Sequence, residues 1–279
     1  MARNNQRRTK SAPKGEASQA PVASVLDFVT PTEFVDLPSR GRFYAVDHPF
    51  HAKETIEIRY MTAKDEDILT NQTLLRKGVA LEKLLQNILS NNEVDPSTLL
   101  IGDRNAIIIA ARSTGYGPVY ATAVDCPGCG EKVTYDFNLN EVRITTGEDV
   151  DDKEIVETDD GTFVVKLPLT KVDAEMRLLT GKDEVETARS TQNKKDPIFD
   201  NILTSQLERV IVSLNGETDR NVINKFIELM PAYDSRYLRE AHAAVTPAID
   251  LAQAFECSSC NHEQKMAVPF TVDFFWPNR

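Results

Sequence analysis

Alternation of apolar and polar residues predicts β-strands in several parts of the chain. The pattern is clearest in Thr55–Met61 and Lys132–Leu139. The stretches Val119–Val124 and Ala248–Phe255 each lead into a turn, and Lys265–Trp276 leads out of one. We therefore expect two hairpins far apart in the sequence.

Apolar residues at helical spacing predict a helical block before the first hairpin. Thr62 is a suitable N-cap for a short helix over Asp65–Gln72. The apolar stripe of Leu81–Leu89 predicts another helix, and Pro96 can begin a further one. The middle of Asp103–Arg112 is apolar nearly all round, which predicts a central buried helix.

Roughly a hundred residues separate the two hairpins, and their pattern is mixed. Asp159–Gly161 is a strong turn signal between two short apolar runs, which predicts a further hairpin. Thr170 with Asp173 indicates the start of a helix that carries Val172, Met176 and Leu179. Three more helices are expected: one from Pro197 to Leu214, one after Thr218-Asp219 and one from about Asp234.

These patterns predict an α+β fold, consisting of a helical block plus a split zinc-ribbon-like β unit with an inserted β-hairpin and helical subdomain. Residues 1–24 are expected to be a disordered basic tail. The N-terminal strands and helical block occupy 25–117, and the β unit combines 118–140 with 247–279. The insertion is 141–246. Beyond the paired cysteine turns, no internal repeat is evident.

The four cysteines carry the most definite chemistry in the chain. They form two Cys-x-x-Cys pairs, Cys126 with Cys129 and Cys257 with Cys260. Two such turns supply the four tetrahedral ligands of a structural zinc ion, and four thiolates leave no open position for water. We therefore expect these four residues to bind Zn²⁺ as a structural cofactor. Reduced unligated thiols and a redox disulfide are the alternatives.

Three histidines are candidates for additional metal ligands. His262 follows the second pair closely, but four cysteines already complete a zinc shell, so we expect it to be a neighbour. His48 and His51 have a spacing that could bind a metal, but no third ligand lies near them in the sequence. We assign neither of them to a site.

Composition and charge narrow the class of protein. The 279 residues are 41% hydrophobic and 27% charged, which is typical of a globular protein. No apolar run is long enough for a transmembrane helix, and no signal peptide is evident, so we expect a reducing cytoplasm. The net charge is −11, of which residues 1–24 carry +4, so the remaining chain carries −15. Such an acidic body argues against nucleic-acid binding by the folded part.

The usual enzyme signatures are missing from the sequence. We find no phosphate-binding Gly-x-x-x-x-Gly-Lys loop, no Gly-x-Ser-x-Gly elbow and no His-Glu-x-x-His helix. Acidic pairs such as Asp159-Asp160 lie in a predicted turn, where solvation accounts for them. We therefore assign no catalytic and no cofactor-binding residue besides the metal ligands, and expect a protein that is not an enzyme.

Several segments together resemble the T4-type bacteriophage baseplate proteins, a family that includes a hub subunit and a hub-assembly factor. The resemblance runs from about residue 30 to the C-terminus, and the insertion contributes little to it. It rests on Leu37–Tyr44, Met61–Leu69, Leu99–Asn105, Arg112 with Tyr116-Gly117, the Cys126/Cys129 turn, and Pro269–Pro277.

The resemblance implies a structural or assembly component of a contractile-tailed phage baseplate hub. Such a protein is made in the host cytoplasm, is found in the virion tail baseplate and binds other baseplate or hub tail proteins, without a membrane. Two alternatives stay open: a hub-assembly chaperone that is not part of the virion, and a zinc-ribbon nucleic-acid-binding regulator using the basic tail. The C-terminal Phe274–Pro277 could anchor a partner or pack on the protein's own sheet.

Overall fold

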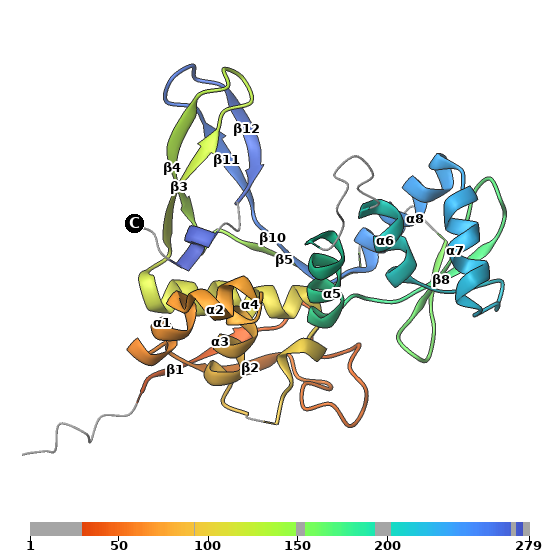
Figure 1. Ribbon diagram of the computed structural model, residues 1–279, viewed down its shortest axis with the longest axis horizontal. Coiled ribbons are helices and arrows are strands. Elements are labelled where there is room, and N and C mark those ends of the chain that lie inside the picture. The colour runs from red at the N-terminus through yellow and green to blue at the C-terminus, as the bar shows by residue number, and fades with distance from the viewer. Residues whose placement is uncertain (1–29, 92, 149–153, 193–201, 269–271, 276–279) are drawn as a thin grey trace, which may run out of the picture. The chain divides into compact units, whose positions relative to one another are not determined.

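A computed structural model describes residues 30–91, 93–148, 154–192, 202–268 and 272–275. The chain divides into Met1–Thr30 and a unit from Pro31 to Arg279. The expected basic tail over 1–24 lies outside the described residues. Helices and small antiparallel sheets make up the described part, which confirms the α+β class (Figure 1). No helix in the described ranges is both long enough and apolar enough to cross a membrane.

A two-stranded sheet and a group of helices form the first part of the unit. Strand β1 (Thr32–Asp36) pairs antiparallel with β2 (Thr55–Arg59). The helix α4 (Ile101–Tyr116) buries most of its middle, as its apolar sequence predicts. The other helices here are α1 (Ala63–Thr70), α2 (Gln72–Arg76), α3 (Ala80–Ile88) and a 3-10 turn at Pro96–Thr98.

Two antiparallel hairpins carry the cysteine pairs at their tips (Figure 1). The first consists of β3 (Val119–Asp125) and β4 (Lys132–Asn138). The second consists of β11 (Ala252–Glu256) and β12 (Glu263–Ala267). Below them, β5 (Arg143–Thr145) pairs with β10 (Ala248–Asp250).

The segment between the hairpins forms a four-stranded sheet in the order β6-β7-β8-β9, with four helices. The turn expected at Asp159–Gly161 joins β6 to β7, so that hairpin is confirmed. The strands are β6 (Ile155–Glu157), β7 (Phe163–Lys166), β8 (Asp173–Met176) and β9 (Ile211–Leu214). The helices are α5 (Gly181–Gln192), α6 (Ile202–Val210), α7 (Arg220–Leu229) and α8 (Ala232–Val245).

The helix expected after Thr170 is wrong, because Asp173–Met176 is strand β8. Thr170 does not cap a helix there; its hydroxyl donates to Asp234 at 2.7 Å. Within β8, Ala174 and Met176 are buried and alternate with half-exposed acidic residues. The spacing of the apolar positions is therefore that of a strand.

The single helix expected from Pro197 to Leu214 is also wrong at its end. Helix α6 stops at Val210, and the chain continues directly as strand β9, where Ile211 and Leu214 are buried in the sheet. Position 197 lies outside the described residues. Helix α5 was not predicted, because its sequence is polar and carries no apolar stripe.

The end of strand β2 and the start of helix α1 are joined by an arginine clamp. Arg59 binds both carboxylate oxygens of Asp65, at 2.6 and 3.0 Å. The amide and hydroxyl of Thr62 also donate to this carboxylate, each at 2.8 Å. Burial alone would raise the pKa of Asp65, but the bonds from Arg59 and Thr62 outweigh it and lower the pKa to about 2.

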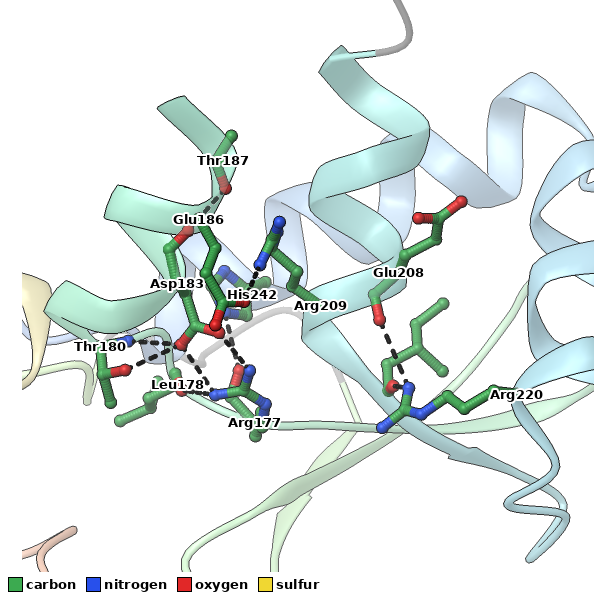
Figure 2. Close-up of polar contacts among 11 residues, drawn as sticks. Arg177, Leu178, Thr180, Asp183, Glu186, Thr187, Glu208, Arg209, Arg220 and His242 are labelled. Atoms are coloured by element: carbon green, nitrogen blue, oxygen red, sulfur yellow. Dashed lines mark hydrogen bonds and ion pairs between the residues drawn. The ribbon is translucent and has the colours of Figure 1, made fainter. Parts of the chain in front are cut away.

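The end of β8 and the start of α5 carry the same clamp (Figure 2). Arg177 binds the two oxygens of Asp183 at 2.5 and 3.0 Å. The amide and hydroxyl of Thr180 each donate to Asp183 at 2.9 Å. The two clamps share the sequence pattern Arg-x-x-Thr-x-Lys-Asp-Glu, beginning at Arg59 and at Arg177.

A second shared feature precedes each clamp. The first strand of each pair is followed by Leu-Pro, at Leu37-Pro38 after β1 and at Leu167-Pro168 after β7. In both pairs the next strand returns antiparallel and leads into the clamp. A further strand contact is common to both repeats. Ile58 of β2 forms an antiparallel bridge with Leu89, and β8 correspondingly pairs antiparallel with β9.

The loop after each Leu-Pro is held by an aspartate at the third residue of a later helix. In α4 this is Asp103, which accepts from the amide of Ser39 at 2.9 Å and from its hydroxyl at 2.5 Å. Tyr44 adds a third bond to Asp103, at 2.8 Å.

In helix α8 the corresponding residue is Asp234. Its carboxylate accepts from the amides of Leu169 and Thr170 at 2.8 and 2.9 Å, as well as from the Thr170 hydroxyl. Each of the two helices is then followed by a cysteine-bearing hairpin. The expectation of no repeat beyond the cysteine turns is therefore wrong. We call 31–140 the first repeat and 154–268 the second.

The C-terminal 3-10 turn, Val272–Phe275, is attached to the first repeat. Phe274 and Phe275 are buried, and the ring of Phe274 lies 5.1 Å from that of Tyr120. The fully buried Arg112 donates to the Phe274 carbonyl at 2.6 Å and to that of Gly117 at 2.7 Å. Of the two roles considered for this segment, packing on the protein itself applies to its described part. Residues 276–279 lie outside that part.

Candidate metal centre

The first cysteine pair lies in a tight turn between β3 and β4. The Cys126 amide donates to the Glu131 carbonyl at 2.9 Å, and the Gly130 amide donates back to the Cys126 carbonyl at 2.7 Å. Gly130 has a φ of 74°, in the left-handed region that glycine adopts most easily. The Gly128 amide points at the Cys126 sulfur, 3.3 Å away. The turn thus presents both sulfurs on one side.

The second pair lies in a turn of the same design between β11 and β12. The Cys257 amide donates to the His262 carbonyl at 3.0 Å, and the Asn261 amide to the Cys257 carbonyl at 2.9 Å. Asn261 takes the left-handed conformation, with a φ of 55°, which asparagine tolerates better than most residues. The Ser259 amide lies 3.4 Å from the Cys257 sulfur. Each hairpin therefore contributes an equivalent half of the site.

The four sulfurs converge at the tips of the two hairpins. Sγ of Cys126 lies 3.8 Å from that of Cys260, and Sγ of Cys129 lies 3.9 Å from that of Cys257. All four lie within 4.8 Å of one another. A zinc ion with Zn–S bonds of about 2.3 Å in a tetrahedral shell separates its sulfurs by about 3.8 Å. A disulfide would need about 2.0 Å, and all four cysteines are free.

The thiols cannot all ionise independently at this spacing. The Ser259 amide stabilises the thiolate of Cys257 and lowers its pKa to about 7. At Cys260 the His262 backbone also favours the thiolate, but burial and the neighbouring sulfurs outweigh it and raise the pKa to about 12. Like charges this close oppose each other. A bound divalent cation would remove that opposition, so the donor set fits a thiophilic metal.

Side chains between the hairpins keep the two halves together. The Tyr135 hydroxyl on β4 donates to the Ala254 carbonyl on β11 at 2.8 Å. The Gln253 amide bonds both backbone groups of Asn138, at 3.0 and 2.7 Å. The Tyr135 ring also packs 5.1 Å from the ring of Phe255. The sulfurs are therefore positioned by protein contacts on their own hairpins and between them.

The histidines lie outside the sulfur cluster. The His262 ring packs over Gly128, where a Cβ atom would come within 2.8 Å of it. His48 stacks on Tyr44 at 4.4 Å and contacts Thr98, and His51 contacts the Tyr44 carbonyl. Within the described ranges, the four cysteines are the one group of three or more histidine, cysteine or acidic residues able to hold a metal.

The clamp aspartates were not predicted as a set. The spacing of Thr62 and Asp65 predicts a capping box, but it predicts neither the arginine partner of Asp65 nor the counterpart Asp183. The shared Arg-x-x-Thr-x-Lys-Asp-Glu pattern was a signal that could have identified both.

A comparison with protein families decides the identity of the chain. The family model described as T4 bacteriophage base plate protein matches residues 31–276. The chain belongs to this family. The match covers both repeats of the baseplate protein and all four cysteines, and it confirms the resemblance to T4-type baseplate proteins. Searches of curated proteins and of solved structures gave no significant match for this baseplate protein.

Proposed function

We propose that this baseplate protein is a structural component of the baseplate hub in a contractile-tailed phage and acts through protein–protein contacts. The observation that carries the proposal is the family match over 31–276, which includes both repeats. Membership of a baseplate family supports a location in the virion tail, and we propose that assembly in the host cytoplasm precedes it. Hub tail proteins are its proposed partners.

The second part of the proposal is a structural zinc ion bound by all four cysteines: Cys126, Cys129, Cys257 and Cys260. The sulfur separations of 3.8 and 3.9 Å support it, because they match a tetrahedral zinc shell. Each repeat contributes two ligands, so the ion would join the hairpins of the two repeats. Four thiolates close the shell, which favours a structural over a catalytic ion.

The buried acids support a role without catalysis. Asp65 and Asp183 bind arginines, and Asp103 and Asp234 hold loops through three hydrogen bonds each. Each of these carboxylates therefore has a structural task. A non-enzymatic scaffold is the function that this arrangement supports best.

A quantitative proteome of purified phage tails tests the proposed location. We expect the chain at a fixed stoichiometry with other baseplate proteins. Its absence from tails, combined with its capture by hub proteins from infected cells, would favour the assembly-chaperone alternative. Absence from both preparations would contradict a baseplate role. Retardation of DNA or RNA with a steep salt dependence would favour the nucleic-acid-binding regulator instead.

A further inference from the structure

The start of helix α4 is covered by the second repeat. The Ile101 amide donates to the Leu179 carbonyl at 3.1 Å. The Gly181 amide donates to the Leu99 carbonyl at 2.9 Å. We call residues 99–101 a helix-start edge and residues 179–181 a capping segment. Their two bonds run in opposite directions, as in a short piece of antiparallel sheet.

The second repeat has an equivalent helix-start edge, residues 230–232, at the start of α8. The backbone has the same form: Leu100 has φ −58° and ψ 142°, and Pro231 has φ −57° and ψ 140°. The register is fixed by Asp103 and Asp234, which are both the third residue of their helices. The two edges therefore present their carbonyl and amide groups alike.

Within the described part of the chain, the helix-start edge of the second repeat is open, unlike that of the first. Among the described residues, no hydrogen bond joins the Met230 carbonyl or the Ala232 amide to another group. Three large apolar side chains are exposed beside it: Leu229 by 73%, Tyr233 by 60% and Leu169 by 59%. Exposed apolar side chains gathered in this way mark interaction surfaces.

Pro231 does not prevent pairing at the open edge. It corresponds to Leu100, which forms an antiparallel bridge with Thr180. The Leu100 amide takes no part in that contact, since it donates to the Tyr44 hydroxyl at 3.0 Å. The contact uses only the groups of residues 99 and 101. A proline at the central position therefore costs no intermolecular hydrogen bond.

The first repeat has the matching capping segment, residues 61–63. The Thr62 amide and hydroxyl bind Asp65, as those of Thr180 bind Asp183. This leaves the Met61 carbonyl and the Ala63 amide without a hydrogen-bond partner in the described part of the chain. Ala63 is exposed, and Met61 and Thr62 are half-exposed.

We propose that a second copy of this chain docks its capping segment 61–63 on the helix-start edge 230–232. The Ala63 amide then donates to the Met230 carbonyl, and the Ala232 amide to the Met61 carbonyl, repeating the internal contact. The two surfaces differ, so the interface is head-to-tail, and successive copies form a closed ring or an open chain. This inference goes beyond the proposed baseplate role and does not rest on it.

Two differences between the repeats shape the intermolecular contact. Gly181 lies close to Arg104, whose Cδ would be 3.2 Å from an added Cβ. In the second repeat the residue that corresponds to Arg104 is Ser235. Its smaller side chain leaves room for the methyl group of Ala63, the counterpart of Gly181. Gly102 approaches the Pro247 carbonyl closely. The corresponding residue of the second repeat is Tyr233. A docked copy therefore stays farther from this position and packs against the tyrosine ring.

Paired single variants of the full-length protein test the proposal. Tyr233→Glu blocks the helix-start edge, and Ala63→Glu blocks the capping segment. Both place an acid in the first turn of a helix, where it is tolerated, so the fold is retained. We expect the molar mass of the wild type, measured by light scattering, to rise with concentration. Each variant alone should stay monomeric.

An equimolar mixture of the two variants gives the decisive result. Each variant keeps one intact surface, so the mixture should form species of twice the monomer mass and nothing larger. A wild type that stays monomeric at every concentration, or a mixture that stays monomeric, would overturn the proposal. Val46→Glu replaces an 85% exposed valine outside both surfaces and should assemble like the wild type. Leu229→Gln, an independent change at the edge, should weaken assembly.

Discussion

Asp103 and Asp234 occupy the same position in corresponding helices, but their surroundings differ. Asp103 lies under the loop that joins β1 to β2, and burial raises its pKa even though Ser39 and Tyr44 donate to it. At Asp234 burial acts in the same direction, but the bonds from Leu169 and Thr170 outweigh it and lower the pKa. The same helix-start aspartate can therefore serve a deeply buried loop or a short turn.

The two repeats also differ in what they contact. In the first repeat the helix-start edge is covered by the second repeat, whereas no described residue covers the edge of the second repeat. Arg112 of α4 also holds the C-terminal turn, and α8 has an alanine at the corresponding place, Ala243. The two repeats are therefore similar scaffolds that differ at the surfaces through which they hold each other.

Loss of one proposed metal ligand should give the largest effect. Structural zinc contributes on the order of 10 kcal/mol in small peptides, and each repeat supplies half of the shell. We expect Cys126→Ser and Cys257→Ser to lose bound zinc and to lower the unfolding temperature equally. Zinc analysis and calorimetry measure both quantities. Ser258→Ala, in the same turn but not a ligand, should leave both unchanged. Unequal effects of the two cysteine variants would argue against equivalent halves.

Removal of the helix-start aspartates should rank second. Asp103→Ala and Asp234→Ala each leave three donors without their acceptor, which costs roughly 3–5 kcal/mol. Denaturant unfolding measures this loss. Asp219→Ala is a control, because Asp219 caps α7 through an exposed bond and its loss should cost only about 1 kcal/mol. If Asp103→Ala costs no more than Asp219→Ala, the buried carboxylate does not hold the loop.

The pH dependence should separate the clamps from Asp103. The folded-state pKa of Asp65 is about 2, below its unfolded value, so its contribution of about 2 kcal/mol is present above about pH 4 and is lost as the pH falls towards 2. Asp183, whose pKa is also lowered, should behave alike. Asp103 has a raised pKa, so its contribution is lost as the pH rises through that value.

Unfolding free energies of Asp65→Asn and Asp103→Asn, each compared with the wild type across the pH range, test this contrast. The difference for Asp65→Asn should shrink at low pH. The difference for Asp103→Asn should shrink at higher pH. Changes in the same direction for both variants would contradict the assigned environments.

The smallest effects should come from changes at the left-handed residues of the two cysteine turns. Gly130 and Asn261 both have left-handed backbones, with φ of 74° and 55°. Gly130→Ala should destabilise by about 1 kcal/mol, because a Cβ is strained there. Asn261→Gly relieves that strain but adds flexibility, so we expect a change below about 0.5 kcal/mol. Thermal unfolding measures the stability of both variants. A larger loss of stability for Asn261→Gly would show that the asparagine side chain contributes to the turn.

Local patterns in the sequence predicted much of the fold, because the information lay within a few residues. The alternation in Lys132–Leu139 and the apolar centre of α4 gave the right elements. The strand β8 was misassigned because Thr170 and Asp173 have the spacing of a cap, while the partner of Thr170, Asp234, lies far along the chain. Helix α5 has too few apolar residues to show a stripe.

The candidate site was predictable because cysteine spacing is a local signal with few meanings. What the sequence did not reveal was the repeat around it, since only short stretches such as Arg59–Glu66 and Arg177–Glu184 remain alike. Their correspondence becomes evident once both are seen between a strand and a helix. The open helix-start edge likewise depends on which surfaces meet in three dimensions.

We propose that one zinc ion joins the two repeats, with two cysteine ligands from each. X-ray absorption at the zinc edge, with metal analysis of the purified full-length protein, tests it most directly. We predict one zinc per chain and a shell of four sulfurs at about 2.3 Å. A chain without zinc, or a shell containing nitrogen or oxygen in place of sulfur, would contradict the account.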